Sequence, residues 1–443
     1  MRKKHVQSVG IGILIALTVG ACGKSDNQTN VMLKDDDFAK QTVTLKLFNH
    51  GAGINTDHDL NKTFIEPIQK KYPNVSVELI KGRKLEELAA AGEIPDLIIT
   101  SNYYLIQPLD LGLGSDLRDL IKRGTIDLSK FEPEAVNVVK GYGEGIYGKN
   151  GEMYGIPFSL NYGLVAYNKD IFDKFGVPYP KDNMTWNQLI DLSQKVTRYD
   201  DGTQYIGIDP GPALALSRAY SLPLLDKNRE KADLTTEGFQ KVFAQAKRIF
   251  DYPGQVIDPN KRYVYGVAYF LKERKLALYP YWLDSFATQL TTPDEPGKQF
   301  NWDMISYPSY DDRPGIGREV DFHLLMVPQA AKNREAAYRV IELLTGEEAQ
   351  KDMNQRARLT IMKDKELRKQ YARDMKIFEG KNLSGIFNVT PAPLPQASKY
   401  DPNIYGFLND ALKSVIQENV DINTALRTAN EKANKFIEEK KNQ

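Results

Sequence analysis

The chain has a single cysteine, Cys22, among its 443 residues. No internal disulfide can form, so the fold depends on its core alone. The sequence has four histidines, and although His50 and His58 lie near each other, no cysteine or clustered third ligand accompanies them. The glycine-containing loop at 49–53 lacks the Lys-Ser/Thr ending of a phosphate-binding loop. We therefore expect neither a metal nor a cofactor.

The chain also lacks an excess of charge of either sign. Its 59 Lys and Arg residues face 58 Asp and Glu residues, and loss of residues 1–21 would leave 56 basic against 58 acidic side chains. This balance excludes a strongly basic nucleic-acid binder. Beyond the N-terminus no apolar run is long enough to span a membrane. The remaining composition, 41% hydrophobic and 26% charged with 24 Tyr and 18 Phe, is that of a globular protein with room for two or three domains.

The N-terminus has the pattern of an export signal. Basic residues at 2–4 precede an apolar segment at 9–19 and the small residues Gly20 and Ala21. Residues 19–22 (Val-Gly-Ala-Cys) resemble a bacterial lipobox, which implies that residues 1–21 are removed and that Cys22 carries lipid. An ordinary signal peptide with an incidental cysteine is the alternative. Residues 22–40 are polar and charged, and we expect a flexible stalk that tethers the protein to the extracytoplasmic face of the cell membrane.

From residue 43 the pattern alternates between strand and helix. Strand-like runs at 43–48, 75–80 and 96–100 are separated by segments with helical spacing. This order predicts a mainly parallel sheet flanked by helices, with ligands bound beyond the carboxyl ends of the strands. Polar and aromatic residues follow two of these strands: Asn49 and His50 after the first, and Asn102, Tyr103 and Tyr104 after the third. We take them as candidate ligand contacts.

Residues 151–176 have the pattern of a crossing between two lobes. Glycines and Pro157 mark its start, a short apolar strand is expected at 164–167, and helical spacing follows at 169–175. Asn161 and Tyr162 lie within this crossing and are candidate ligand contacts.

An aromatic and acidic cluster at 281–284 is the strongest binding candidate. Tyr281, Trp282 and Asp284 follow an apolar strand that is expected to end at Pro280. Aromatic faces stack on the apolar faces of sugar rings, and a neighbouring carboxylate accepts hydrogen bonds from their hydroxyls. The simpler alternative is that the two aromatic residues fill a core.

Two further residues are weaker candidates. Arg218 could bind an acidic sugar, or it could be a solvated helix arginine. Tyr405 follows a proline-rich loop at the start of a helix, where it could line a cleft or pack between helices.

The chain resembles the bacterial extracellular solute-binding proteins, the family that includes maltose-binding protein. The resemblance rests on Pro157-Phe158 followed by Tyr-Asn-Lys-Asp-Ile-Phe at 167–172, on Gly-Glu-Ile-Pro-Asp-Leu at 92–97, and on the Lys-Asn-Arg-Glu-Ala-Ala helix start at 332–337 with Thr-Gly-Glu-Glu-Ala at 345–349. It implies a two-lobed, periplasmic-binding-protein-like α/β fold of type II with the ligand cleft between the lobes.

The resemblance also implies an organisation and a function. The N-terminal lobe is expected to comprise residues 41–155 and 320–362, and the C-terminal lobe residues 156–319 and 363–443. A monomer of this kind captures a carbohydrate, here an oligosaccharide, by hinge closure and delivers it to the permease subunits of an ABC importer, without being an enzyme.

Two alternatives remain at this point. One is a surface carbohydrate-binding or adhesin protein that is not coupled to transport. The other is a lipid-anchored glycosidase, which would need a second carboxylate at a fixed distance from Asp284, and the sequence shows no obvious partner.

Overall fold

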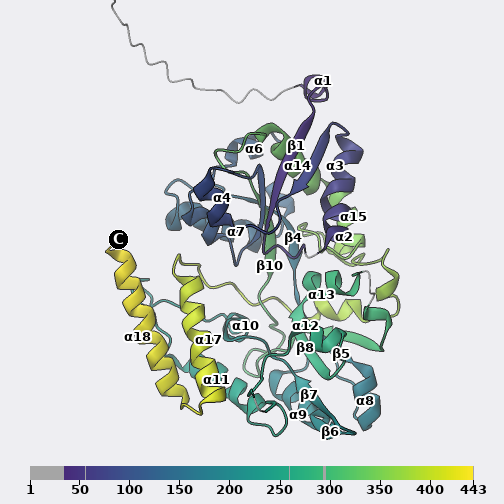
Figure 1. Ribbon diagram of the computed structural model, residues 1–443, viewed down its shortest axis with the longest axis vertical. Coiled ribbons are helices and arrows are strands. Elements are labelled where there is room, and N and C mark those ends of the chain that lie inside the picture. Colours follow the sequence, from purple (N-terminus) through teal and green to yellow (C-terminus); the bar gives the residue numbers. More distant parts are fainter. Residues whose placement is uncertain (1–33, 55, 259, 293–295, 443) are drawn as a thin grey trace, which may run out of the picture.

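The structure is a computed structural model that describes residues 34–54, 56–258, 260–292 and 296–442. The predicted signal peptide and Cys22 lie outside these residues. The described chain forms two lobes, one above the other in Figure 1, and each lobe is built on a five-stranded sheet flanked by helices. The two-lobed α/β fold predicted from the sequence is confirmed.

The first sheet has the strand order β2-β1-β3-β10-β4. Its strands are β1 (Val43–His50), β2 (Val75–Leu79), β3 (Leu97–Ser101), β4 (Ile156–Asn161) and β10 (Asp321–Met326). Every residue of β3, β4 and β10 is buried, as expected for strands that are covered on both faces.

The second sheet has the strand order β6-β7-β8-β5-β9. Its strands are β5 (Gly163–Asn168), β6 (Arg198–Asp200), β7 (Thr203–Ile208), β8 (Leu276–Trp282) and β9 (Trp302–Ser306). Strand β8 continues through Pro280 to Trp282 and so is longer than predicted, which places the aromatic pair 281–282 at its end.

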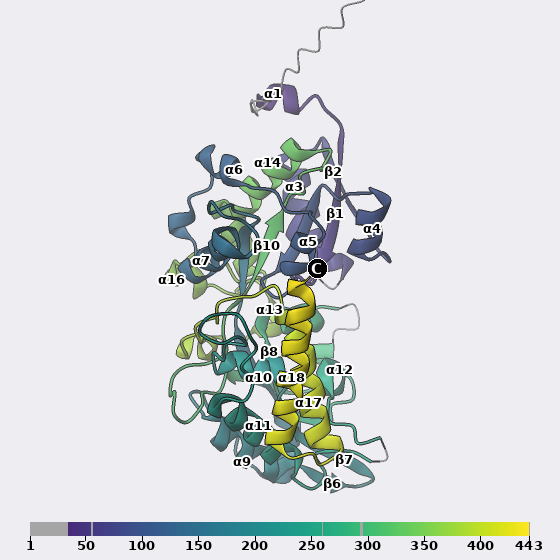
Figure 2. The same ribbon diagram turned by 90° about the vertical axis from the view of Figure 1, so that its left-hand side faces the viewer.

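The helices divide between the two sheets (Figures 1 and 2). With the first sheet lie α1 (Asp35–Phe38), α2 (Asp57–Leu60), α3 (Glu66–Lys71), α4 (Leu85–Ala91), α5 (Ile106–Asp110), α6 (Arg118–Lys122), α7 (Pro133–Gly141), α14 (Arg334–Thr345), α15 (Glu347–Gln355) and α16 (Lys365–Arg368). With the second lie α8 (Lys169–Phe175), α9 (Trp186–Val196), α10 (Ala213–Ala219), α11 (Glu237–Phe250), α12 (Gly266–Leu271), α13 (Leu283–Leu290), α17 (Asp401–Gln417) and α18 (Ile422–Lys441). Among the described residues, none of these helices combines the length and apolar character that a membrane span requires.

Both sheets are mixed rather than mainly parallel as predicted. Strand β10 is antiparallel to both of its neighbours, and so is β5. Each of these strands enters its sheet directly from the other lobe. The helical crossover that makes consecutive strands parallel is therefore absent at these two points.

The chain passes between the lobes later than predicted. Strand β4 pairs with β10 in the first sheet and β5 belongs to the second, so the first crossing falls at Tyr162 and not before residue 156. Pro157 lies in β4 rather than in a turn. It pairs with Leu324 next to a register shift, where a residue without an N–H is tolerated.

The later crossings also differ from the predicted boundaries. The chain returns to the first lobe through residues 307–320, and the segment after residue 362 first stays with that lobe, since the Tyr371 hydroxyl donates to the Ala357 carbonyl at 3.0 Å. Lys381 then donates to the Trp302 carbonyl at 2.7 Å, which places this part of the chain on the second lobe.

The predicted flexible stalk is wrong for its last residues. Residues 35–38 form α1, and Phe38 is buried against Tyr72 and under the guanidinium of Arg339, which also pairs with Asp35. The segment is mostly polar, but its one aromatic side chain, Phe38, docks a single helical turn onto the first lobe.

Several local predictions are confirmed. Strand β5 is followed directly by α8, and Thr185 caps α9 in a capping box with Gln188. Trp186, at the start of α9, is fully buried, as expected for a packing residue. The turn at 200–203 joins β6 and β7 as a hairpin.

Candidate ligand-binding cleft

A cavity of about 1160 Å³ lies between the two lobes, and we call it the cleft. The first lobe contributes Asn102, Tyr103, Tyr104, Gln107, Asp110, Asp321 and His323, and the second contributes Asp209, Arg218, Tyr281, Trp282, Ser285, Asp401 and Tyr405. The residues therefore come from strands, helices and loops that are separated in sequence by up to about three hundred positions.

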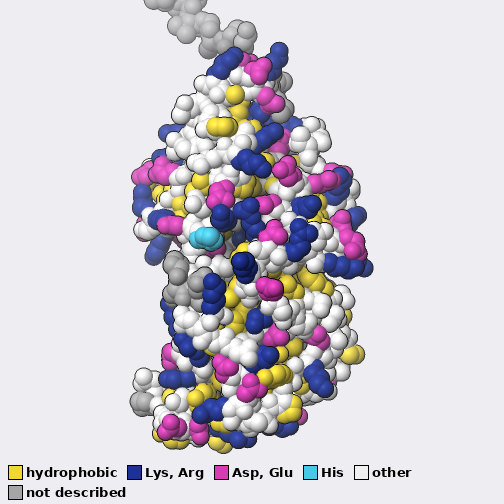
Figure 3. Space-filling model, turned by 90° about the vertical axis from the view of Figure 1, so that its right-hand side faces the viewer, with side chains coloured by type: hydrophobic (Ala, Val, Ile, Leu, Met, Phe, Trp, Pro, Cys, Tyr) yellow, Lys and Arg dark blue, Asp and Glu magenta, His cyan; other side chains and the backbone are white. Residues whose placement is uncertain are grey.

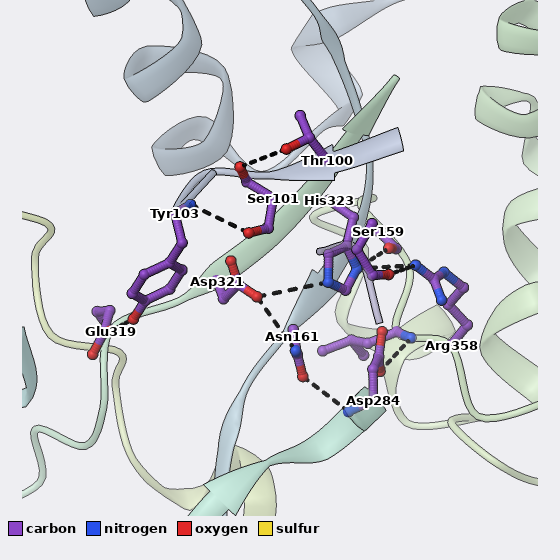
Figure 4. Close-up of polar contacts among 12 residues, drawn as sticks. Thr100, Ser101, Tyr103, Ser159, Asn161, Asp284, Glu319, Asp321, His323 and Arg358 are labelled. Carbon is purple, nitrogen blue, oxygen red and sulfur yellow. Dashed lines mark hydrogen bonds and ion pairs between the residues drawn. The ribbon is translucent and has the colours of Figure 1, made fainter. Parts of the chain in front are cut away.

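Two aromatic side chains meet across the cleft. Tyr103 follows β3 in the first lobe and Trp282 ends β8 in the second, and their ring centroids lie 6.0 Å apart at an angle of 73°. Tyr103 is placed by the turn after β3, where its N–H donates to the Ser101 hydroxyl at 3.3 Å (Figure 4). The edge-to-face geometry leaves Trp282 half-buried at the cleft wall.

Two guanidinium groups stack on these aromatic rings. The Cζ of Arg318 lies 3.6 Å from the ring centroid of Trp282, and the Cζ of Arg218 lies 4.1 Å from that of Tyr103. Arg218 also donates through Nε to the Tyr405 hydroxyl at 3.0 Å. The Tyr103 hydroxyl bonds in turn to Glu319, which is fully buried beside Arg318.

A buried polar network links the cleft to the crossings (Figure 4). Asn161, at the end of β4, donates to Asp321 Oδ2 at 3.4 Å and accepts the N–H of Asp284 at 2.9 Å. The Oδ1 atom of Asp284 accepts the N–H of Leu359 at 3.2 Å. Residues of the first crossing, the return crossing and α13 are therefore joined in one network.

His323 has a defined tautomer in this network. Its Nδ1 lies 3.0 Å from Nη2 of Arg358 and 3.0 Å from the Ser159 hydroxyl. A guanidinium only donates, so Nδ1 must accept and the ring proton sits on Nε2, which lies 3.6 Å from Asp321 Oδ2. Burial, with Arg358 nearby, holds the pKa of His323 well below its usual value, so the ring is neutral.

Burial also raises the pKa values of the two carboxyl groups of the network. It raises the pKa of Asp321 to about 8 and that of Asp284 to about 7, although Asn161 and Arg358 respectively oppose the shift. Asp321 is therefore mostly protonated at neutral pH, and its contact with His323 joins two neutral groups rather than an ion pair.

Seven of the twelve residues proposed from the sequence line the cleft. They are Asn102, Tyr103, Tyr104, Arg218, Tyr281, Trp282 and Tyr405. Arg218 is buried and not a solvated helix arginine. Whether these seven touch a ligand stays a prediction.

The other five residues take different positions. The side chain of Asn49 bonds to Ile54 and Ala52 and so closes its own loop, while His50 packs edge-on against Tyr104. Asn161 holds the network described above. Tyr162 lies in the crossing, where its hydroxyl accepts from Arg368 at 3.2 Å.

Asp284 lines a different, smaller pocket of about 240 Å³, together with Arg356, Arg358 and residues of α2. Asn161 accepts the backbone N–H of Asp284, while the carboxyl group of Asp284 accepts the N–H of Leu359 and does not line the cleft. Basic side chains gather at the junction of the lobes on the face shown in Figure 3.

The candidate residues chosen from the sequence include none from the return crossing. Arg318 precedes β10, and Asp321 and His323 share one face of that strand because they are two residues apart. The signal available in the sequence was an otherwise apolar strand with polar residues at its first and third positions, Asp321 and His323. Among the described residues, no group of three or more His, Cys, Asp and Glu side chains could hold a metal ion.

An aromatic and polar cavity lies between two α/β lobes, and the chain passes repeatedly from one lobe to the other. This arrangement defines a protein that binds a solute between its lobes. The comparison with known families agrees. The profile of the bacterial extracellular solute-binding proteins matches residues 57–351, and the chain belongs to this family.

Relatives with assigned ligands are distant. The chain is 24% identical over 197 residues to the multiple sugar-binding protein of Streptococcus mutans. The matched segment covers 44% of this chain and 41% of that protein. It is 29% identical over 136 residues to the arabinooligosaccharide-binding protein of Bacillus subtilis, covering 31% of this chain and 27% of that one. The matched part thus spans less than half the length of these relatives.

Solved structures match over most of the chain. An ABC substrate-binding protein of Listeria monocytogenes in complex with cycloalternan superposes with a TM-score of 0.72 at 18% identity, over 89% of this chain and 98% of that one. The mannobiose-bound protein CpMnBP1 gives a TM-score of 0.70 at 20% identity, over 89% and 100%. At these identities the likeness shows the fold.

Proposed function

We propose that the protein captures an oligosaccharide between its lobes, closes on it by a hinge motion, and delivers it to the permease subunits of an ABC importer. It acts as a monomer on the extracytoplasmic face of the membrane, tethered by lipid on Cys22. The observation that carries the proposal is a cleft in which aromatic rings from both lobes meet beside buried polar groups.

The chemistry of the cleft fits a sugar. Trp282 and Tyr103 supply flat apolar surfaces, and the buried Asn102 Oδ1 and Asp321 Oδ1 have no hydrogen-bond partner among the described residues. Ligand hydroxyls both donate and accept, so they can pair with the Asn102 acceptor and with the protonated carboxyl group of Asp321, whose burial without a partner is otherwise costly.

The size of the cleft favours an oligosaccharide over a monosaccharide. Its volume of about 1160 Å³ exceeds the roughly 300–1,000 Å³ that is usual for the sites of drug-sized ligands. The names of the relatives support the same class, since they include proteins for multiple sugars and for arabinooligosaccharides.

A thermal-shift screen of the purified protein against mono- and oligosaccharides tests the proposal. A ligand that binds only the folded protein stabilises it by about 2.7 kcal/mol at a hundredfold excess over Kd, so a clear rise in Tm is expected with one glycan family. Chromatography of the incubated glycan should show no cleavage. A flat screen across neutral and acidic sugars would contradict the proposal.

Trp282→Ala identifies the cleft as the site. We expect about tenfold or greater loss of affinity, because the variant removes a stacking surface, with little change in the Tm of the free protein. Tyr199→Ala is the matched control, since Tyr199 is an exposed aromatic on the β6–β7 hairpin and should leave affinity unchanged. Equal affinity in the wild type and Trp282→Ala would remove Trp282 from the site.

A further inference from the structure

Two buried arginines line the cleft. Arg218, on α10, is 8% exposed, and Arg318, on the return crossing, is 6% exposed. A guanidinium taken out of water costs free energy unless anions or hydrogen-bond acceptors meet it. The hydrogen-bond and ionic partners of these two guanidiniums therefore indicate which chemical class of ligand the cleft binds.

The two guanidiniums lie over the aromatic rings, and their in-plane N–H donors are only partly used by neighbouring side chains. All five N–H donors of a guanidinium lie in its plane, so stacking of Arg318 on Trp282 and of Arg218 on Tyr103 does not use them. Among the described residues, Arg218 makes one hydrogen bond, through Nε to Tyr405, and its terminal nitrogens have no acceptor. The buried Nε of Arg318 has none either.

Each of the two arginines has an acidic neighbour, but among the described residues neither carboxylate accepts a hydrogen bond from these guanidiniums. Glu319 Oε2 lies 3.6 Å from Arg318 Nε and is fully buried, and Asp401 lies beside Arg218. Burial raises the pKa of Asp321 to about 8, so this third acid is mostly neutral and does not repel an anion at neutral pH.

The first lobe also offers an acceptor to the ligand. The buried Asn102 Oδ1 lacks a partner among the described residues, and it follows β3 on the opposite lobe from Arg218. A ligand that fills the cleft must donate hydrogen bonds on the side of the first lobe and present acceptors to the in-plane donors of the guanidiniums. Carboxylate is the group that matches a guanidinium edge with two parallel hydrogen bonds.

We infer that the ligand is an acidic oligosaccharide, one that contains a uronic acid, and that its carboxylate pairs with Arg218 and Arg318 while its hydroxyls meet Asn102 and the aromatic faces. This inference rests on the proposed function and names the substrate class of the same cleft.

Matched glycans test the inference in the wild-type protein. Isothermal titration would compare oligogalacturonides, oligoalginates and glucuronate-containing oligosaccharides, each with its carboxyl-reduced derivative. The reduced glycan has the same ring and linkage but a neutral hydroxymethyl group. At least one acidic glycan is expected to bind roughly 10- to 100-fold more tightly than its reduced form, the range typical for hydrogen bonds to a charged group.

Variants then assign the carboxylate to its partners. Arg218→Gln and Arg318→Gln should each lower affinity for the acidic glycan by at least tenfold and change affinity for the reduced glycan much less. Arg313→Gln is the matched control, because Arg313 also stacks on a tyrosine, Tyr220, at 4.1 Å but does not line the cleft. If either cleft variant fails to fold, the comparison of acidic and reduced glycans in the wild-type protein still tests whether the ligand is acidic.

The outcomes separate the two proposals. Preference for the acidic glycan that disappears in the cleft variants supports the inference. Equal or tighter binding of the reduced or other neutral glycans overturns the inference and leaves the proposed function standing. Absence of binding by every acidic and neutral glycan overturns both.

Discussion

Asp284 and Asp321 are carboxyl groups that burial brings close to neutrality. Both belong to the network that joins the crossings, and each forms hydrogen bonds that a neutral side chain can also make. Their pKa values of about 7 and about 8 follow from lost hydration, which the nearby Arg358 and Asn161 oppose only in part. Ionisation of either group therefore works against the folded state.

The contribution of these two carboxyl groups to the stability of the protein is accordingly expected to fall as pH rises toward 8. Asp284 binds its proton more tightly in the folded protein than the ordinary pKa of 3.8 allows, so between about pH 4 and pH 7 the folded state holds more protons than the unfolded state. The contribution of Asp284 to the free energy of unfolding then decreases across this window.

Asp284→Asn isolates this effect. Asparagine keeps the acceptor for the Leu359 N–H and cannot ionise, so we expect equal stability to the wild type near pH 4 and roughly 1–3 kcal/mol more at pH 8. Urea denaturation at both pH values measures the difference. A gap between variant and wild type that is the same at both pH values would show that Asp284 does not titrate as proposed. The pKa shifts of His323 and of other groups are present in both proteins, so their contributions cancel in the difference between the two free energies of unfolding.

At the scale of elements, strand β5 begins where the two crossings pass each other. A Cβ added to Gly163 would lie 2.7 Å from the Cβ of Arg318 and 2.9 Å from the ring of Tyr307. Neither contact is the far end of a flexible side chain, so the return crossing would have to shift. Gly163 therefore lets β5 lie against the segment that carries a cleft arginine.

Gly163→Ala should consequently weaken ligand binding as well as stability. We expect a loss of about 1–3 kcal/mol in the free energy of unfolding, typical of overpacking, and a several-fold loss in affinity because Arg318 moves. Gly141→Ala is the control: this glycine lies in α7 with open space at its Cβ, where alanine should be neutral or stabilising. Unchanged affinity in Gly163→Ala would mean that the crossing adapts without moving the cleft.

At the scale of the whole molecule, the two lobes meet at the crossings and across the cleft. Tyr103 from the first lobe touches Arg218 and Trp282 from the second, and few other aromatic contacts bridge the cavity. A fold of two lobes joined by narrow crossings moves most easily by rotation of one lobe against the other.

Closure on ligand should therefore reduce the size of the molecule in solution. We expect the radius of gyration from small-angle X-ray scattering to decrease on addition of a saturating glycan, because a bound ligand favours the conformation that contacts it from both lobes. The Trp282→Ala variant at the same glycan concentration should show a smaller decrease. A constant radius of gyration at saturation would exclude hinge closure.

The sequence by itself determined much of the local structure. Hydrophobic periodicity and caps act over a few residues, so they were sufficient to predict β5 with α8, the Thr185 cap of α9 and the hairpin after Asp200. The same local signals predicted Tyr103 beyond a strand and Trp282 near the end of one; both line the cleft, although β8 itself extends to Trp282.

Only the tertiary structure decided how these elements combine. Three features depend on pairings between residues far apart in the chain. They are the antiparallel insertion of β10, the contact of Arg318 with Trp282, and the hydrogen bond that the Asp284 carboxyl group accepts from Leu359. Two further contacts were not predicted for the same reason: the Asn49 side chain bonds within its own loop, and Phe38 docks against Arg339. Such contacts are set by the packing of whole lobes, and no pattern in a short window of sequence specifies them.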